Sequence, residues 1–176
     1  NKEHERINIF DIWTEDGEQP KRAVINSITI DQNRNVWMGT DNGIYRYTAD
    51  FVSHRFYAFG QSGLSHRIVR KVMVDSRGIL WVATVNGVNY SDPTIDRFVA
   101  VDPGTHEYTL KYVYNLKEDL EGNILANISN GLCRIHPDLD SKGHITHIRR
   151  TALSLDGIIQ ISNNDIRWYE VHNPGT

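Results

Sequence analysis

The chain has 176 residues, with 19 Lys and Arg against 22 Asp and Glu, so its formal net charge is −3. Hydrophobic residues make up 39% of the chain, which is enough for a packed core and excludes a disordered protein. The acidic balance and the absence of a Lys/Arg block argue against nucleic acid as a partner, and no apolar run approaches the roughly 18 residues of a membrane span. The length suits one domain or part of a larger one.

An internal repeat with a period of 44 residues organises the chain. Asp31 and Asp75, like Trp37 and Trp81, are separated by this period, and a third copy keeps Asp119 in register. The predicted division is an outer strand and loop of a preceding unit, three clear units and one degenerate unit: 1–23, 24–67, 68–111, 112–150 and 151–176.

Each unit contains short apolar runs rich in Val, Ile, Tyr, Phe and Trp, which favours strands over helices. Asp75 and Gly78 flank the first turn of the second unit, where Asp can bond to backbone amides ahead of it and Gly tolerates a positive φ. The pair Asn86-Gly87 is typical of a type I′ hairpin. The predicted strands of this unit are Ile68–Val74, Ile79–Thr84, Gly87–Tyr90 and Asp96–Val101.

Four antiparallel strands repeated about every 40–50 residues predict β-propeller blades, so the expected fold class is all-β. In the first two units the second strand is almost entirely apolar, as expected of a sheet covered on both faces by neighbouring blades. Trp37 and Trp81 belong to this strand, where we expect them to fill the space between blades. Thr40 and Thr84 end it, and their hydroxyls can cap the adjacent Asn-Gly turn.

These residues resemble the two-component regulator propeller repeat, whose pattern is an apolar strand ending in Asp, a Gly turn, a Leu-Trp-Ile-Gly-Thr strand and an Asn-Gly-Leu-x-x-Tyr strand. The first two units match this pattern closely, whereas the third has Leu125 for Trp and Ile128 for Thr. The residues that anchor the repeat are Asp31, Trp37, Thr40, Gly43, Asp75, Trp81, Thr84, Gly87, Asp119 and Gly131.

The resemblance implies both a fold and a role. Proteins of this family carry the repeats in large propellers, in the periplasmic sensor half of bacterial two-component proteins. Many are hybrid histidine kinases/response regulators that detect oligosaccharides. The resemblance therefore implies a non-enzymatic, extracytoplasmic sensor module, whose partners are a small oligosaccharide and the rest of the parent sensor protein.

The chain is short for the propellers of this family. A ring of about seven blades needs roughly 310 residues, so we expect about four units of a larger propeller. A complete four-bladed ring is the alternative, and the leading outer strand would permit its closure. In an open arc the sheets at the two ends expose their faces, which favours self-association.

The candidate ligand-binding residues belong to the connections between blades. Because blades hold such connections rigidly, binding clefts commonly form there. Aromatic rings and hydrogen-bonding side chains in these connections suit a sugar. The predicted ligand-binding residues are Gln61, His66, Arg67, His106 and Tyr108.

Recognisable catalytic motifs are missing from the sequence. It contains no Gly-rich phosphate loop, HExxH or GxSxG motif, and its single cysteine excludes a Cys-based zinc site. We therefore expect no catalytic residue, cofactor or metal, and no membrane contact by this segment. A propeller alone does not fix a function, and two alternatives stay open: an enzyme acting on glycans, such as a lyase or glycosidase, and a small stand-alone binding propeller.

Overall fold

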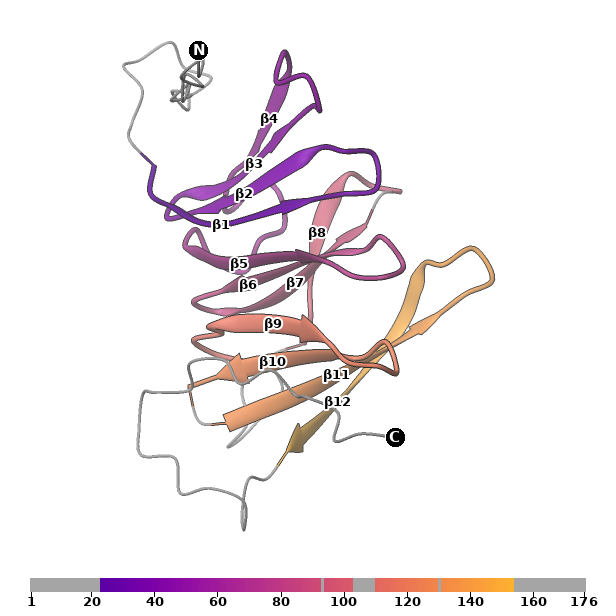
Figure 1. Cartoon of the computed structure of the whole chain (residues 1–176). Coiled ribbons are helices and arrows are strands. Elements are labelled where there is room, and N and C mark those ends of the chain that lie inside the picture. The colour runs from indigo at the N-terminus through magenta and orange to yellow at the C-terminus, as the bar shows by residue number, and fades with distance from the viewer. Residues whose placement is uncertain (1–22, 93, 103–109, 130, 154–176) are drawn as a thin grey trace, which may run out of the picture.

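The computed structural model describes residues 23–92, 94–102, 110–129 and 131–153, and these form three four-stranded sheets. In each sheet the strands follow chain order and each neighbouring pair is antiparallel (Figure 1). The first sheet contains β1 (Ile25–Ile30), β2 (Val36–Thr40), β3 (Gly43–Tyr47) and β4 (His54–Tyr57). The second contains β5 (Val69–Val74), β6 (Leu80–Thr84), β7 (Gly87–Asp92) and β8 (Arg97–Ala100). The third contains β9 (Asn115–Glu118), β10 (Ile124–Ile128), β11 (Gly131–Leu139) and β12 (Ile145–Leu153).

The all-β prediction is confirmed, and so are the four antiparallel strands expected in each of the three clear units. One boundary differs. Thr151–Leu153, which the sequence assigns to the fourth unit, continue β12, because Ala152 and Leu153 pair with Cys133 and Leu132 of β11. The remaining part of that unit, 154–176, and the leading segment 1–22 fall outside the described residues. The described part of the chain holds no helix that could span a membrane.

The three sheets stack face to face, with β1, β5 and β9 next to one another (Figure 1). Strands β1 and β2 contact β5, and strands β5 and β6 contact β9. We call the contact of the first sheet with the second the first interface, and that of the second with the third the second interface. This radial stack of twisted antiparallel sheets is the arrangement of propeller blades.

Apolar side chains from facing sheets make up the core. All five residues of β6 are buried, as the nearly continuous apolar run predicted. Trp37 is 8% exposed and packs with Val69 and Val72 of the next sheet, while Trp81 is fully buried among residues that include Leu116 of the third sheet. The predicted role of the two tryptophans, filling the space between sheets, is confirmed.

The Thr and Gly anchors shape the hairpins between the second and third strands. The Thr40 hydroxyl donates to the Gly43 carbonyl oxygen at 2.9 Å and accepts from the Asn42 N–H at 3.1 Å, and Thr84 makes the same two bonds, so the predicted capping is confirmed. The type I′ prediction is wrong. Such a turn needs a positive φ at both central residues, whereas here the positive φ belongs to the Gly that follows the loop, 119° at Gly43.

One face of the first sheet has no described sheet against it. Ile28 is 57% exposed and Ile30 is 61% exposed, whereas Val72, the counterpart of Ile28 in the second sheet, is 1% exposed because the first sheet covers it. Met38 and Tyr45 belong to the same face, in a cluster separate from the two interfaces. The repeat therefore builds an apolar face on the first sheet that suits another blade.

Candidate functional site

Asp residues at three equivalent positions organise the turns between the first and second strands of the sheets. In each turn, Oδ1 of the carboxylate accepts hydrogen bonds from backbone N–H groups two and four residues ahead, at 2.8 to 3.0 Å. The three residues are Asp31, Asp75 and Asp119. Their predicted role as turn formers is confirmed, and we call this end of the sheets the Asp-turn end.

The second oxygen of the same carboxylates has a role that sequence reasoning missed. The Trp37 indole N–H donates to Asp31 Oδ2 at 2.9 Å, and the Trp81 indole N–H donates to Asp75 Oδ2 at 3.0 Å. Each Asp thus holds both its own turn and the aromatic ring of the adjacent strand. The signal was available, because the Asp and the Trp keep a fixed spacing of six residues in both units.

The third unit places a positive charge, not an indole N–H, beside the same carboxylate. Leu125 replaces the tryptophan, and Arg134 on the neighbouring strand pairs with it. The Arg134 Nε atom is 3.1 Å from Asp119 Oδ2, close enough for an ion pair. The guanidinium therefore faces Asp119 as an ion-pair partner, although its Nε makes no hydrogen bond.

Hydrogen bonding outweighs burial at two of these carboxylates. Burial alone would raise the pKa of Asp31, but hydrogen bonds from Asn35, Trp37 and backbone N–H groups hold that pKa below its ordinary value. The same balance, with Asn123 as a main donor, lowers the pKa of Asp119. Both groups are therefore ionised at neutral pH and accept hydrogen bonds rather than donate protons.

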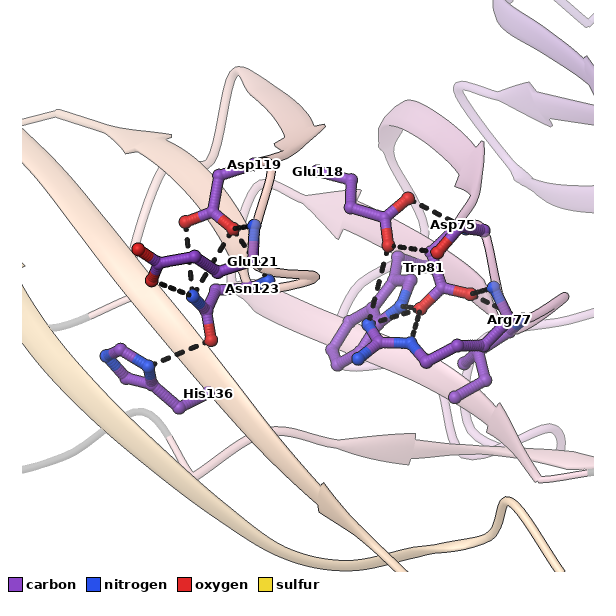
Figure 2. Close-up of polar contacts among 10 residues, drawn as sticks. Asp75, Arg77, Trp81, Glu118, Asp119, Glu121, Asn123 and His136 are labelled. Carbon is purple, nitrogen blue, oxygen red and sulfur yellow. Dashed lines mark hydrogen bonds and ion pairs between the residues drawn. The ribbon is translucent and has the colours of Figure 1, made fainter.

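A long arginine side chain closes the second interface at the Asp-turn end. Arg77 donates to Asp75 Oδ2 from Nε at 2.9 Å and from Nη2 at 2.6 Å, and Nη2 also lies 4.0 Å from Glu118 Oε1 on the third sheet (Figure 2). Its Nη1 atom would be 3.3 Å from a Cβ added at Gly122, so it fills the gap between the turns. With this side chain in place, Asp75 is only 4% exposed.

The first interface is filled differently at the corresponding place, where Gln32 lies 3.0 Å from a Cβ added at Gly78. The residue of the first sheet equivalent to Arg77 is Asn33, whose side chain is short and exposed.

A cavity of about 320 Å³ remains between the first and second sheets. Trp37 and Phe98 contribute to its apolar wall, and Arg46 contributes to its polar wall. The Arg46 Cζ atom lies over the Trp37 ring, 5.5 Å from its centroid, as in a cation–π contact.

Three of the five predicted ligand-binding residues are at the other end of the sheets, which carries the β2–β3 and β6–β7 hairpins and which we call the hairpin end. Gln61 and Arg67 are exposed and His66 is half-buried. Arg67 donates from Nη1 to the Asp41 carbonyl oxygen at 3.2 Å, and His66 Nδ1 accepts from the Ile68 N–H at 3.0 Å. None of the three lines the cavity at the first interface.

The connection that carries these residues is held tightly by the second sheet. Asn89, which is fully buried on β7, accepts from Ser65 N–H at 3.1 Å and from Ser65 Oγ at 2.7 Å, and it donates to the Gly63 carbonyl oxygen at 3.1 Å. Ser65 Oγ also lies 2.8 Å from Thr84 Oγ1. These bonds give the connection a rigid base. Asn89 is a structural anchor that sequence reasoning did not identify, although a polar residue on a buried strand was its signal.

The other two predicted ligand-binding residues, His106 and Tyr108, fall outside the described residues. In the third hairpin the structure describes the repeat residue Gly131. Among the residues that the structure describes, no group of three His, Cys, Asp or Glu side chains is placed to hold a metal ion.

Comparison with known proteins shows the fold. No protein-family model matches the chain, and no curated protein sequence matches it. Among solved structures, the extracellular domain of BT4673 from B. thetaiotaomicron, assigned to a hybrid two-component system, is 24% identical with a TM-score of 0.56. The match covers 62% of this chain and 16% of that chain.

Two further structures show the same architecture. The extracellular domain of BT3049 from B. thetaiotaomicron, likewise assigned to a hybrid two-component system, is 23% identical with a TM-score of 0.50, covering 62% of this chain and 15% of that one. A catalytically inactive virginiamycin B lyase from Staphylococcus aureus, solved with quinupristin, is 19% identical with a TM-score of 0.51, covering 74% of this chain and 42% of that one. The chain thus spans only a small part of the two-component proteins that it resembles.

Proposed function

We propose that this chain is part of an extracytoplasmic, ligand-binding propeller that serves as the sensor of a bacterial two-component protein. The observation that carries this proposal is the stack of blade-like sheets shared with the extracellular domains of BT4673 and BT3049. Transmission of a signal by such a module requires that the ligand bind two arrangements of the parent protein with different affinity.

The ligand we propose is a small oligosaccharide bound at the hairpin end. Gln61 and Arg67 are exposed there, and Arg67 still has donors available beyond its bond to Asp41. The clamp of Ser65 and Gly63 on Asn89 supports this proposal, because a site on a rigid base loses little conformational entropy when it binds.

The open face of the first sheet supports a place within a larger propeller. A surface carrying Ile28 and Ile30 at 57% and 61% exposure is costly in water, and the corresponding surface of the second sheet is covered by a blade. We propose that another blade of the parent protein covers this face. In the isolated chain, a second copy would do so by self-association.

Calorimetric titration of the full chain with a panel of neutral and acidic oligosaccharides, run beside an assay for cleavage of the same compounds, tests the proposal. We expect saturable heat without cleavage, and a loss of affinity of about tenfold in Arg67→Ala, as for one charge-assisted hydrogen bond. Arg149→Ala, an exposed Arg on β12 paired with Asp138, is the matched control and should bind normally. Cleavage of any compound, or equal binding by Arg67→Ala, would contradict the proposal.

A further inference from the structure

The first and second interfaces differ at the residue two positions after the turn Asp. In the second interface, Arg77 crosses the gap between turns and pairs with Asp75. In the first interface, Asn33 occupies the equivalent position and is too short to do the same. Gln32 meets Gly78 at this turn instead, 3.0 Å from a Cβ added there, and the cavity lined by Asn33 remains beside it.

Its volume is suitable for a compact organic molecule. At about 320 Å³ the cavity is near the lower end of the range of small-molecule sites, which runs from roughly 300 to 1,000 Å³. Trp37, Leu80 and Phe98 supply an apolar floor, while charged and amide side chains surround it. Such a lining is typical of sites that orient a ligand by a few polar groups.

The carboxylates that line the cavity already have hydrogen-bond donors. Asp31 accepts two bonds from backbone N–H groups and one each from Asn35 Nδ2 and the Trp37 indole. Asp96 pairs with Arg55 and accepts from the Tyr57 hydroxyl at 3.1 Å.

At the third carboxylate, Asp92 Oδ1 accepts from both the N–H and the hydroxyl of Thr94, at 2.9 and 2.6 Å. The acceptor capacity of the lining is therefore largely used by the protein itself.

The two guanidinium groups of the lining, in contrast, keep their hydrogen-bond donors available. Neither Arg46 nor Arg97 donates a side-chain hydrogen bond to, or forms an ion pair with, another residue in the described part of the chain. The contrast with the third unit is direct, because Arg134, the counterpart of Arg46, is paired with Asp119. The lining carries three carboxylates and two guanidinium groups, and Arg55, which lies outside the lining, pairs with Asp96 and offsets the third carboxylate.

We infer that this cavity is a binding site for a small carboxylate-bearing molecule, with Arg46 as the residue that holds the carboxylate. The Arg46 guanidinium lies over the Trp37 ring, and the planar fork of its N–H groups matches the two oxygens of a carboxylate. The site is independent of the sugar proposed for the hairpin end, because the two sites are at opposite ends of the sheets. A uronic acid and an aliphatic dicarboxylate share the required group.

Titration of the full chain with glucuronate, succinate and glucose, followed in ¹H–¹⁵N spectra at the Trp37 indole N–H, tests the inference. The signal is assigned by its absence from Trp37→Phe. We expect saturable shifts with at least one carboxylate and none with glucose, and the two carboxylate arms show which source fits. Equal shifts with glucose, or no saturable shift with either carboxylate at millimolar concentrations, would overturn the inference.

Three variants locate the site. Arg46→Gln should weaken carboxylate binding about 10- to 100-fold, the range of charge-assisted hydrogen bonds. Asn33→Arg should close the cavity as Arg77 closes the second interface and reduce binding at least about tenfold. Arg67→Gln at the hairpin end should leave it unchanged.

Stability measurements on the same proteins keep the test decisive. Asn33→Arg should fold with an unchanged or higher Tm. If its Tm is lower, the binding affinity of Arg46→Gln alone tests the inference. Unaltered affinity in Arg46→Gln would refute the site whatever Asn33→Arg does, and it would leave the oligosaccharide proposal standing.

Discussion

Trp81→Phe is the most informative single test of how the Asp–Trp pairs stabilise the stack. The substitution keeps an aromatic ring but removes the indole N–H that donates to Asp75 Oδ2 at 3.0 Å. A hydrogen bond to a charged group contributes roughly 1.5–3 kcal/mol, and Asp75, at 4% exposure, has little water to replace it. The smaller ring leaves space in a fully buried position, which costs about 1 kcal/mol more. We expect the free energy of unfolding to fall by about 3 kcal/mol.

Trp37→Phe is the matched control, because Trp37 makes the same bond to Asp31 at 2.9 Å beside an open cavity. Water can reach Asp31, and Asn35 continues to donate to it, so we expect a loss of only about 1 kcal/mol. Equilibrium urea unfolding, monitored by circular dichroism and by the remaining tryptophans, measures both values. A loss in Trp37→Phe as large as that in Trp81→Phe would refute the argument from burial.

Three further predictions follow from individual residues. Arg34 has a φ of 65° where its counterpart Gly78 has 88°, so Arg34→Gly should raise the free energy of unfolding by about 0.5–1 kcal/mol in the same urea assay; a decrease would show that no strain is stored there. The pKa of Asp119 is lower in the folded chain than in the unfolded one, so its contribution is complete above the unfolded pKa, about 3.9, and is lost as the pH falls through the folded value. Between pH 7 and 3 the Tm of Asp119→Asn should therefore fall less than that of the parent, and parallel curves would contradict this. The double variant Ile28→Ser with Ile30→Ser should change stability by less than about 1 kcal/mol but reduce self-association in sedimentation experiments, and an unchanged association state would assign the contact to another surface.

Periodicity was sufficient to predict the sheets because the pattern that sets strand pairing is local. Asp75 and Asn86-Gly87 mark the two turns of the second unit. The apolar run between them predicts a strand that is buried on both faces, and β6 is such a strand. The turn type was mispredicted, since the Asn-Gly pair alone does not say which residue takes the positive φ.

The cavity could not be predicted from motifs, because it depends on how the side chains of two stacked sheets fit together. Asn33 belongs to no motif, and its difference from Arg77 is seen only when the two units are aligned. That Asn33 lines a cavity is seen only in the stacked sheets. The anchoring of the connection by Asn89 likewise depends on a contact between residues 24 positions apart. Whether Gln61, His66 and Arg67 bind a ligand stays a prediction.

The way in which strands are joined has a mechanical consequence. Each sheet is made by hairpins between consecutive strands, and the contacts across interfaces join a sheet to its neighbour in the chain, as β1 and β2 with β5. Load applied to the two ends of the chain would therefore pass through the interfaces in series, and the weakest would yield first. Since the first interface contains a cavity and the second is closed by Arg77, pulling should detach the first sheet as a separate step. A ligand bound in that cavity would raise the force needed to separate the first and second sheets.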